Sequence, residues 1–176
     1  MQIAKNKLAK KPNMDCVNLV TTILACYPQI STLSIIDSNE TIHLHYILNK
    51  VLNNTKINEI KKTLFENLQT YQYLQKFTAD INDINISIKE NFTFIDITRD
   101  ICSFSYGELN LLNNLLLEYL TDLLIIDADK NTIDELNFEQ IMLIDNLLGS
   151  LKVSSIEETI TGIREQGRVV VFNEEE

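Results

Sequence analysis

The sequence predicts a single α+β domain, in which an antiparallel or mixed sheet of about five strands packs against about five helices. Two pairs of short β-branched runs, each joined by a few turn-forming residues, are typical of β-hairpins and imply antiparallel pairing. Other segments carry apolar residues every three or four positions, as amphipathic helices do. With 2 prolines and 4 glycines in 176 residues there is no clear linker, so we expect one domain over residues 14–172.

The first half of the chain is expected to contain two helices and two hairpins. Residues 14–26 have apolar side chains at helical spacing, and Pro28 ends this helix. The runs STLSIID and TIHLHYIL flank the turn-forming sequence DSNE and predict the first hairpin. Residues 54–77 carry one apolar stripe and predict a long amphipathic helix. The runs INISIK and FTFIDIT, on either side of Glu90 and Asn91, predict the second hairpin.

The second half is expected to contain three helices and a final strand. Each helix begins at a Ser/Thr-x-x-Glu pattern, in which the first side chain caps the helix and the glutamate bonds back to the cap. The patterns are Ser105–Glu108 for a Leu-rich helix to about residue 126, Thr132–Glu135 for a helix to about Leu151, and Ser155–Glu158 for a short helix ending at Gly167. The run RVVVF then predicts the last strand, and residues 173–176 form an acidic tail.

The net charge of −10 lies entirely in the C-terminal third of the chain. Residues 1–117 carry 11 acidic and 11 basic side chains, whereas residues 118–176 carry 14 acidic and 4 basic ones. A surface of this sign repels nucleic acids and anionic lipids, so direct nucleic-acid binding is disfavoured. The lysines of residues 1–13 form a short basic arm, which we interpret as a flexible, solvated terminus. A tether to RNA or to the ribosome is the alternative for this arm.

The cysteines favour a cytoplasmic location. Cys16, Cys26 and Cys102 are odd in number, lack Cys-x-x-Cys spacing and have apolar neighbours, which predicts buried, reduced thiols. The sequence before Cys26 resembles a lipoprotein signal, but Asp15 and several other polar residues interrupt its apolar run. No apolar run has transmembrane length, so we expect no membrane association. We also expect no cofactor, because the chain has no Gly-rich phosphate loop and no His-Glu-x-x-His motif.

Residues 126–135, IDADKNTIDE, have the aspartate spacing of a calcium-binding loop. Asp127, Asp129 and Asn131 match positions 1, 3 and 5 of an EF-hand loop. Thr132 replaces the glycine that makes the sharp turn, and Phe138 replaces the closing bidentate glutamate. These three residues are therefore weak metal candidates, and we predict a turn between two helices with no metal.

The two histidines of the chain, His43 and His45, occupy alternate positions of a predicted strand and so point to one face of the sheet. Together with Asp96 or Asp37 from a neighbouring strand they could form a metal site, and Asp96 beside aromatic residues could act as an acid or base. His43, His45 and Asp96 are the candidate catalytic residues. Ile42, Leu44 and Tyr46, which alternate with the histidines, would form the buried face. A solvated or helix-covered pair of histidines is therefore the simpler interpretation.

The segment TGIREQGRVVVF, residues 161–172, contains two of the four glycines and two of the three arginines. Arg164, Gly167 and Arg168 are the candidate binding residues, because a guanidinium offers a planar set of donors for a carboxylate or a phosphate. Helix capping by Gly167 and a favourable helix-dipole interaction of the arginines explain the same residues structurally, and this interpretation is preferred.

These observations predict a cytoplasmic binding or regulatory domain that acts through a protein partner or as a homo-oligomer such as a homodimer. The acidic helices and the last strand would form the contact surfaces. We find no catalytic constellation, which favours a role other than that of an enzyme. The alternative is a small-ligand or metal-binding enzyme or sensor with a pocket at His43, His45 and Asp96. The two hypotheses differ in whether those side chains converge in a concave site.

Overall fold

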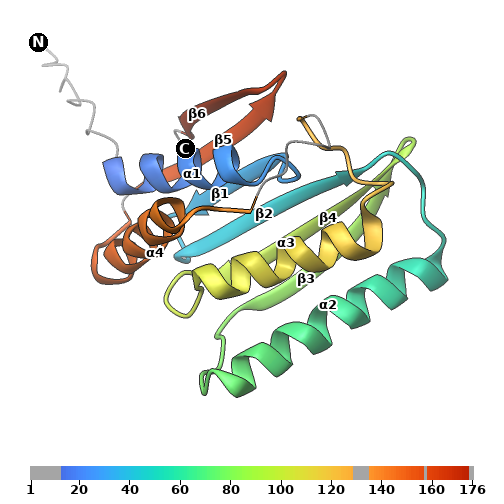
Figure 1. The fold of residues 1–176 in the computed structure, drawn as a ribbon, viewed down its shortest axis with the longest axis horizontal. Helices are drawn as coiled ribbons and strands as arrows, with labels where there is room; N and C mark the ends of the chain where they lie inside the picture. Colours follow the sequence, from blue (N-terminus) through green and yellow to red (C-terminus); the bar gives the residue numbers. More distant parts are fainter. Residues whose placement is uncertain (1–12, 129–134, 157, 175–176) are drawn as a thin grey trace, which may run out of the picture.

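The computed structural model describes residues 13–128, 135–156 and 158–174 and has the predicted α+β class (Figure 1). The described residues form four helices and six strands, where about five of each are expected from the sequence. In chain order the elements are α1 (Met14–Cys26), β1 (Thr32–Ile36), β2 (Thr41–Leu48), α2 (Asn54–Leu74), β3 (Asn82–Lys89), β4 (Phe92–Asp100), α3 (Tyr106–Leu120), α4 (Phe138–Val153), β5 (Thr159–Glu165) and β6 (Arg168–Glu174).

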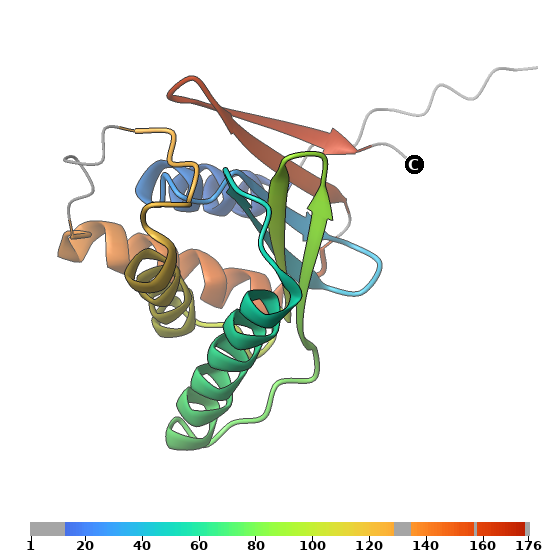
Figure 2. The ribbon, with the colours of Figure 1, turned by 90° about the vertical axis from the view of Figure 1, so that its right-hand side faces the viewer.

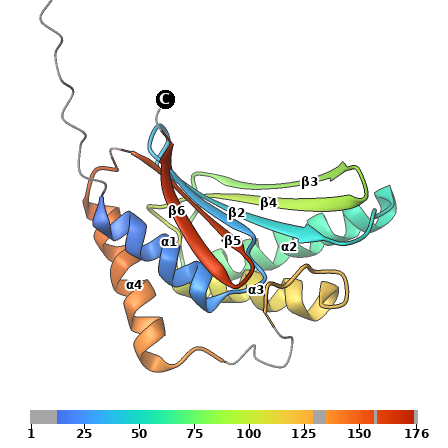
Figure 3. The ribbon, with the colours of Figure 1, turned by 90° about the horizontal axis from the view of Figure 1, so that it is seen from above.

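All six strands belong to one antiparallel sheet with the order β3-β4-β2-β1-β5-β6. The four helices lie on the same face of this sheet, so the molecule has two layers (Figures 2 and 3). The buried side chains of β1, β2, β4 and β5 face these helices and form one core with them. None of the described helices covers the opposite face, which we call the open face of the sheet.

The elements of the first half match the prediction because local pattern and burial agree there. α1 covers the predicted range, and Asn13 caps it by accepting a hydrogen bond from the Asp15 backbone amide at 3.0 Å. Both hairpins form at the expected places, and α2 ends at Leu74, close to its predicted end.

The predicted helix between Ser155 and Gly167 is wrong, since this segment forms the strand β5 and the turn into β6. Its β-branched residues favour a strand, and β5 finds a partner in β1. Gln166 and Gly167 have positive φ angles of 50° and 73°, as required by the tight two-residue turn between right-handedly twisted strands. Gly167 is therefore a hairpin residue, not the residue that ends a helix.

The helices α3 and α4 differ from the prediction at the connection between them. α3 ends at Leu120 and not near residue 126, because the chain turns there and Leu124 forms a bridge with Leu48 at the end of β2. α4 begins at Phe138, capped by Asn137 and Gln140, which accept hydrogen bonds from each other's backbone amides at 2.9 Å. Glu135 precedes this helix, and the predicted cap Thr132 lies outside the described residues.

The three cysteines are free thiols, but their burial differs from the prediction. Cys16 is buried, as expected for a residue on the inner face of α1. Cys102 is exposed, because it lies in the turn between β4 and α3, and Cys26 is half-buried at the end of α1.

A buried ion-pair network joins the end of β4 to α3. The side chains of Arg99 and Glu108 are both fully buried, and Arg99 donates hydrogen bonds to the two carboxylate oxygens of Glu108 through Nε and Nη2. Nη1 of Arg99 donates to Asp100 and to the carbonyl oxygen of Ile81, and Nη2 also donates to Ser103 Oγ at 3.0 Å. The guanidinium therefore binds groups of four residues, which compensates for its removal from water.

The same network modifies the predicted cap of α3. Ser105 caps the helix as predicted, because its hydroxyl accepts a hydrogen bond from the Glu108 backbone amide at 3.2 Å. The carboxylate of Glu108, which was expected to bond back to the cap, binds Arg99.

We expect acid to weaken the fold through Asp100. Burial alone would raise the pKa of Asp100, but hydrogen bonds from Ser103, Ile81 and Arg99 outweigh it and lower the pKa from 3.8 to about 2. Between about pH 2 and pH 4 the folded state thus binds fewer protons than the unfolded state. Asp100 therefore contributes about 2 kcal/mol to the free energy of unfolding above about pH 4, and this contribution is lost as the pH falls through about 2.

Urea unfolding between about pH 5 and about pH 2 measures this loss. Asp100→Asn is the matched control, because an amide at this position cannot titrate. We expect the variant to be less stable than the wild type near pH 5 and to lose less stability on acidification. An equal loss of stability in both proteins would contradict this role of Asp100.

A glycine of β5 allows α1 to lie close to the sheet. A Cβ atom at Gly162 would lie 2.3 Å from Val20 Cγ1 and 2.7 Å from Leu24 Cδ1, both on α1. These distances are far shorter than a van der Waals contact, so any side chain at this position would displace the helix or its residues.

Candidate functional site

The two histidines and Asp96 lie together on the open face, as the alternation of β2 predicts. Ile42, Leu44 and Tyr46, which alternate with the histidines, are fully buried, so His43 and His45 point away from the helices. β2 pairs with β4 in a register that sets Asp96 directly opposite His45 and Thr98 directly opposite His43. The site is therefore formed by cross-strand neighbours in the middle of the sheet.

His45 and Asp96 are in direct contact, whereas His43 forms separate hydrogen bonds. Nδ1 of His45 contacts Oδ1 of Asp96, and the two side chains are 36% and 29% exposed. His43 Nε2 lies 3.0 Å from Thr41 Oγ1, and its Nδ1 lies 3.5 Å from Thr98 Oγ1. Burial and then the neighbouring His45 lower the pKa of His43, against the opposite effect of Asp96, so His43 is neutral at neutral pH.

This arrangement can orient an imidazole and exchange a proton. Among the described residues, however, it has neither further metal ligands nor a hydroxyl or thiol hydrogen-bonded to the His45 ring. Across residues 13–128, 135–156 and 158–174, no three His, Cys, Asp or Glu side chains are placed to hold a metal ion. Ser34 lies opposite His43 on β1, but its hydroxyl is hydrogen-bonded to Thr161 Oγ1 at 2.8 Å. The His45–Asp96 pair is thus a polar centre of the open face, suited to recognition by hydrogen bonds.

Apolar side chains lie on both sides of this polar centre. On one side Phe94 on β4 lies opposite Ile47 on β2, and the exposed Phe92 is at the end of the same strand. On the other side Ile163 on β5 lies opposite Val170 on β6. Val170 and its neighbour on the same face, Phe172, are 48% and 42% exposed. The open face therefore has a polar centre with exposed apolar side chains at either end, and clustered exposed apolar side chains are a feature of interaction surfaces.

The structure brings two of the predicted binding residues together with one predicted metal candidate. Arg164 donates hydrogen bonds to the Asp127 carbonyl oxygen from Nε and Nη2, at 3.3 and 3.2 Å, and to the Leu24 carbonyl oxygen from Nη1. Nε of Arg164 also lies 3.4 Å from Asp127 Oδ2, and this carboxylate accepts a hydrogen bond from the Gly167 amide at 2.7 Å. These contacts attach the β5–β6 hairpin to the end of α1 and to the segment after α3.

The remaining candidate residues lie apart from this attachment. Arg168 is exposed and begins β6 immediately after the turn. Asp129 and Asn131 lie outside the described residues, as do residues 1–12 of the predicted basic arm. The binding role of Arg164, Gly167 and Arg168 stays a prediction, although Arg164 and Gly167 already serve an internal contact.

The outer edge of β6 is a second feature of this part of the sheet. β6 is the last strand in the sheet order, and its central residues 169–172 are all apolar, with neither charge nor proline. Charged residues and proline usually protect edge strands, because the unpaired backbone groups of an edge strand readily pair with another strand. The other edge strand, β3, contains Asp83 and ends at Lys89. β6 also has a charged residue at each end, Arg168 and Glu174, but its centre is entirely apolar, whereas Asn85 and Ser87 interrupt the centre of β3.

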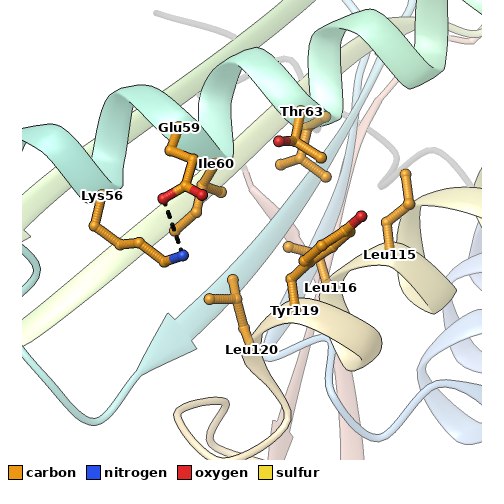
Figure 4. Close-up of a pocket in the computed structure, with 9 residues that line it drawn as sticks. Lys56, Glu59, Ile60, Thr63, Leu115, Leu116, Tyr119 and Leu120 are labelled. Atoms are coloured by element: carbon orange, nitrogen blue, oxygen red, sulfur yellow. Dashed lines mark hydrogen bonds and ion pairs between the residues drawn. The ribbon is translucent and has the colours of Figure 1, made fainter.

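The groove between α2 and α3 is too small to hold an organic ligand (Figure 4). Ile60 and Thr63 of α2 face Leu116 and Tyr119 of α3 across it. Its volume is about 30 Å³, room for one or two water molecules, whereas ligand pockets have volumes of roughly 300–1,000 Å³. We interpret this groove as the packing boundary of the two helices.

The chain matches no protein-family model, no curated protein and no solved structure. None of the helices in the described part of the chain is both long and apolar enough to cross a membrane.

Proposed function

We propose that this chain is a protein-interaction domain that forms a homodimer through the edge strand β6. The observation that carries the proposal is the apolar centre of the outer edge strand β6, residues 169–172, next to the exposed apolar end of the open face. A second copy of the chain is the partner that fits best, because β6 is complementary to itself in one antiparallel register.

The backbone geometry of the hairpin selects this register. Glu165 and Arg168 close a two-residue turn and form a hydrogen-bonded pair, so every second residue from Arg168 directs its backbone groups toward β5. The backbone N–H and C=O groups of Val169, Val171 and Asn173 consequently point to the free edge. If a two-fold axis passes beside Val171, Val171 lies opposite its own copy, and Val169 lies opposite Asn173 of the second copy.

This register uses every outward backbone group of the three residues. It also sets Val170 opposite Phe172 of the second copy on the open face, a pairing of β-branched and aromatic side chains that stabilises sheets. A shift by two residues in either direction would leave one of the three outward residues of each strand without a partner. The pairing would join the two sheets into one, whose open face carries two His45–Asp96 pairs.

The test is the mass of the protein in solution, measured by sedimentation equilibrium or by light scattering. The wild type should have about twice the chain mass of 20.3 kDa. Val171→Pro should have the mass of a single chain, because proline removes the backbone donor at the two-fold axis. This donor points away from β5, so the hairpin keeps its own hydrogen bonds.

Two further variants separate pairing from folding. Val171→Thr is the matched control, since it keeps both the backbone N–H and the branched side chain, and it should remain dimeric. Phe172→Lys sets a charge opposite Val170 of the second copy on an exposed position and should weaken the dimer without unfolding the chain. If the wild type had the mass of one chain at all concentrations, the proposal would be wrong. An intact dimer in Val171→Pro would also contradict it.

A further inference from the structure

The strand β6 carries opposite charges at its two ends. Arg168 begins the strand and Glu174 ends it, on either side of the apolar residues 169–172. Successive residues of a strand alternate between the two faces of its sheet, so both charged residues occupy positions on the open face, in line with Val170 and Phe172. A strand that pairs with the outer edge of β6 therefore meets a positive charge at one end and a negative charge at the other.

The guanidinium of Arg168 is available to a partner. The other two arginines of the chain, Arg99 and Arg164, bind carboxylates and carbonyl oxygens of the chain itself. Arg168 is exposed and forms no ion pair with the acidic side chains that the structure describes. A guanidinium presents a planar set of donors that fits a carboxylate. An acidic residue at the facing position of a second strand would therefore bind it.

The proposed dimer places such a residue opposite Arg168. In the register with the two-fold axis beside Val171, facing residues are equally distant from Val171 along their strands. Arg168 precedes Val171 by three residues and Glu174 follows it by three, so Arg168 of each chain faces Glu174 of the other chain. Because Val171 and its copy form a hydrogen-bonded pair, these positions form a non-hydrogen-bonded pair, in which the two Cα atoms are only about 4.5 Å apart.

We propose that these two charge pairs, one on each side of the two-fold axis, determine the partner and the register of β6. They select a second copy of the chain in antiparallel orientation, with Val171 at the axis. The proposal rests on the dimer proposed above and names the residues that make its pairing specific. It also gives a binding role to Arg168, one of the candidate binding residues of the sequence.

Other arrangements of two β6 strands lose both charge pairs. A shift by two residues in one direction sets Arg168 opposite Phe172, and a shift in the other direction sets Glu174 opposite Val170, so charged residues face apolar ones. A parallel pairing in register would bring each charge beside the same charge of the second copy, which destabilises a sheet. The antiparallel register about Val171 is therefore the one that the charges favour.

The symmetry of the dimer doubles the effect of each charge. A single exposed ion pair contributes little to stability, but the two-fold axis supplies two of them. Reversal of one charge in each chain consequently converts both attractive pairs of the dimer into like-charge pairs. The net charge of −10 makes two chains repel each other at a distance, so local attraction at β6 matters for their association.

The test begins with two charge reversals, Arg168→Glu and Glu174→Lys. Sedimentation equilibrium of each full-length variant should give a dissociation constant of the dimer about tenfold or more above that of the wild type, because like charges then face each other on both sides of the axis. For Glu174→Lys this weakening would occur although the variant has less negative charge, which by itself reduces the repulsion between chains.

An equal mixture of the two variants is the decisive sample. In a heterodimer of Arg168→Glu with Glu174→Lys, opposite charges face each other again on both sides of the axis. The mixture should therefore associate with a dissociation constant close to that of the wild type, and native mass spectrometry should identify the heterodimer by its mass. Recovery in the mixture also shows that both variants are folded. The double variant Arg168→Glu/Glu174→Lys has the wild-type net charge and should form a homodimer again.

Lys61→Glu and Glu118→Lys are the matched controls. They change the net charge by the same amounts at exposed positions of α2 and α3, away from β6. The dissociation constant should stay within about twofold of the wild-type value in both. Weakening in the controls equal to that in the β6 variants would overturn the proposal, because the effect would then come from net charge alone.

The same measurements separate this proposal from that of the dimer. A wild type that is monomeric at all concentrations would overturn both. A dimer that Val171→Pro dissociates but that Arg168→Glu and Glu174→Lys leave intact would overturn the charge pairing alone. A mixture of the two reversed variants that forms no heterodimer would contradict the antiparallel register as well.

Discussion

Replacing Arg99 with methionine is expected to lower the free energy of unfolding by about 3–5 kcal/mol. Methionine fills a similar space but offers no donor, so Glu108 would stay fully buried with its charge uncompensated. Asp100 would lose one partner but keep the hydrogen bonds from Ser103 and from the Ile81 amide. The loss should therefore arise chiefly from Glu108, and urea unfolding at neutral pH measures it.

A second substitution tests this explanation. Arg99→Met combined with Glu108→Met removes the charge that the first change leaves unpaired, and should recover a large part of the lost stability. Replacing a buried ion pair by apolar residues is often close to neutral, whereas removal of one partner is not. If the free energy of unfolding of Arg99→Met alone lay within about 1 kcal/mol of the wild-type value, a structural role for the network would be contradicted.

The substitution Gly162→Ala should be destabilising by about 1–3 kcal/mol, although it adds a single methyl group. The added carbon would lie 2.3 Å from Val20 Cγ1, so α1 or its side chains must move away from the sheet. Thermal unfolding should show a lower Tm than that of the wild type. Val20→Ala in the Gly162→Ala background makes room for the new methyl group and should recover part of the loss.

Gly149→Ala is the matched control for this prediction. It introduces the same methyl group into α4, where the added carbon would have no atom within 4 Å apart from its chain neighbours and the nearby backbone of its own helix. Alanine favours a helix over glycine by roughly 0.5–1 kcal/mol, so the control should raise stability. A loss of stability in both variants would show that the added methyl group acts through something other than the contact with α1.

Local patterns predicted those elements whose partners lie nearby in the sequence. The two N-terminal hairpins follow from alternation, and the burial of Leu44 between His43 and His45 follows from the same alternation. β5 was missed because Ser155 and Glu158 imitate a capping box and Gly167 imitates the end of a helix. Its true determinant is pairing with β1, and nothing close in the sequence indicates that contact.

The same limit applies to the candidate site: local patterns indicate single residues, but not the contacts between residues far apart in the sequence. His45 and Asp96 lie on two hairpins recognisable from the sequence, but the pairing of β2 with β4 that brings them into contact joins different hairpins and was not predicted. The contact between Asp127 and Arg164 joins residues 37 apart in sequence, and each was interpreted alone. A cavity between the end of α1, the helix α3 and the residues before α4 was not predicted, because its walls come from three segments far apart in the sequence.

The strand order has a consequence for the synthesis of the protein. β1 lies inside the sheet between β2 and β5, yet Ser34 and its partner Thr161 are 127 residues apart. At a translation rate of about 5–20 residues per second, the nascent chain waits roughly 6–25 s for the strand that completes this pairing. Once β4 has been made, and until β5 follows, β1 is an edge strand of a four-stranded sheet, β3-β4-β2-β1. The ribosome-bound chain is then open to premature pairing and to chaperones that bind such edges.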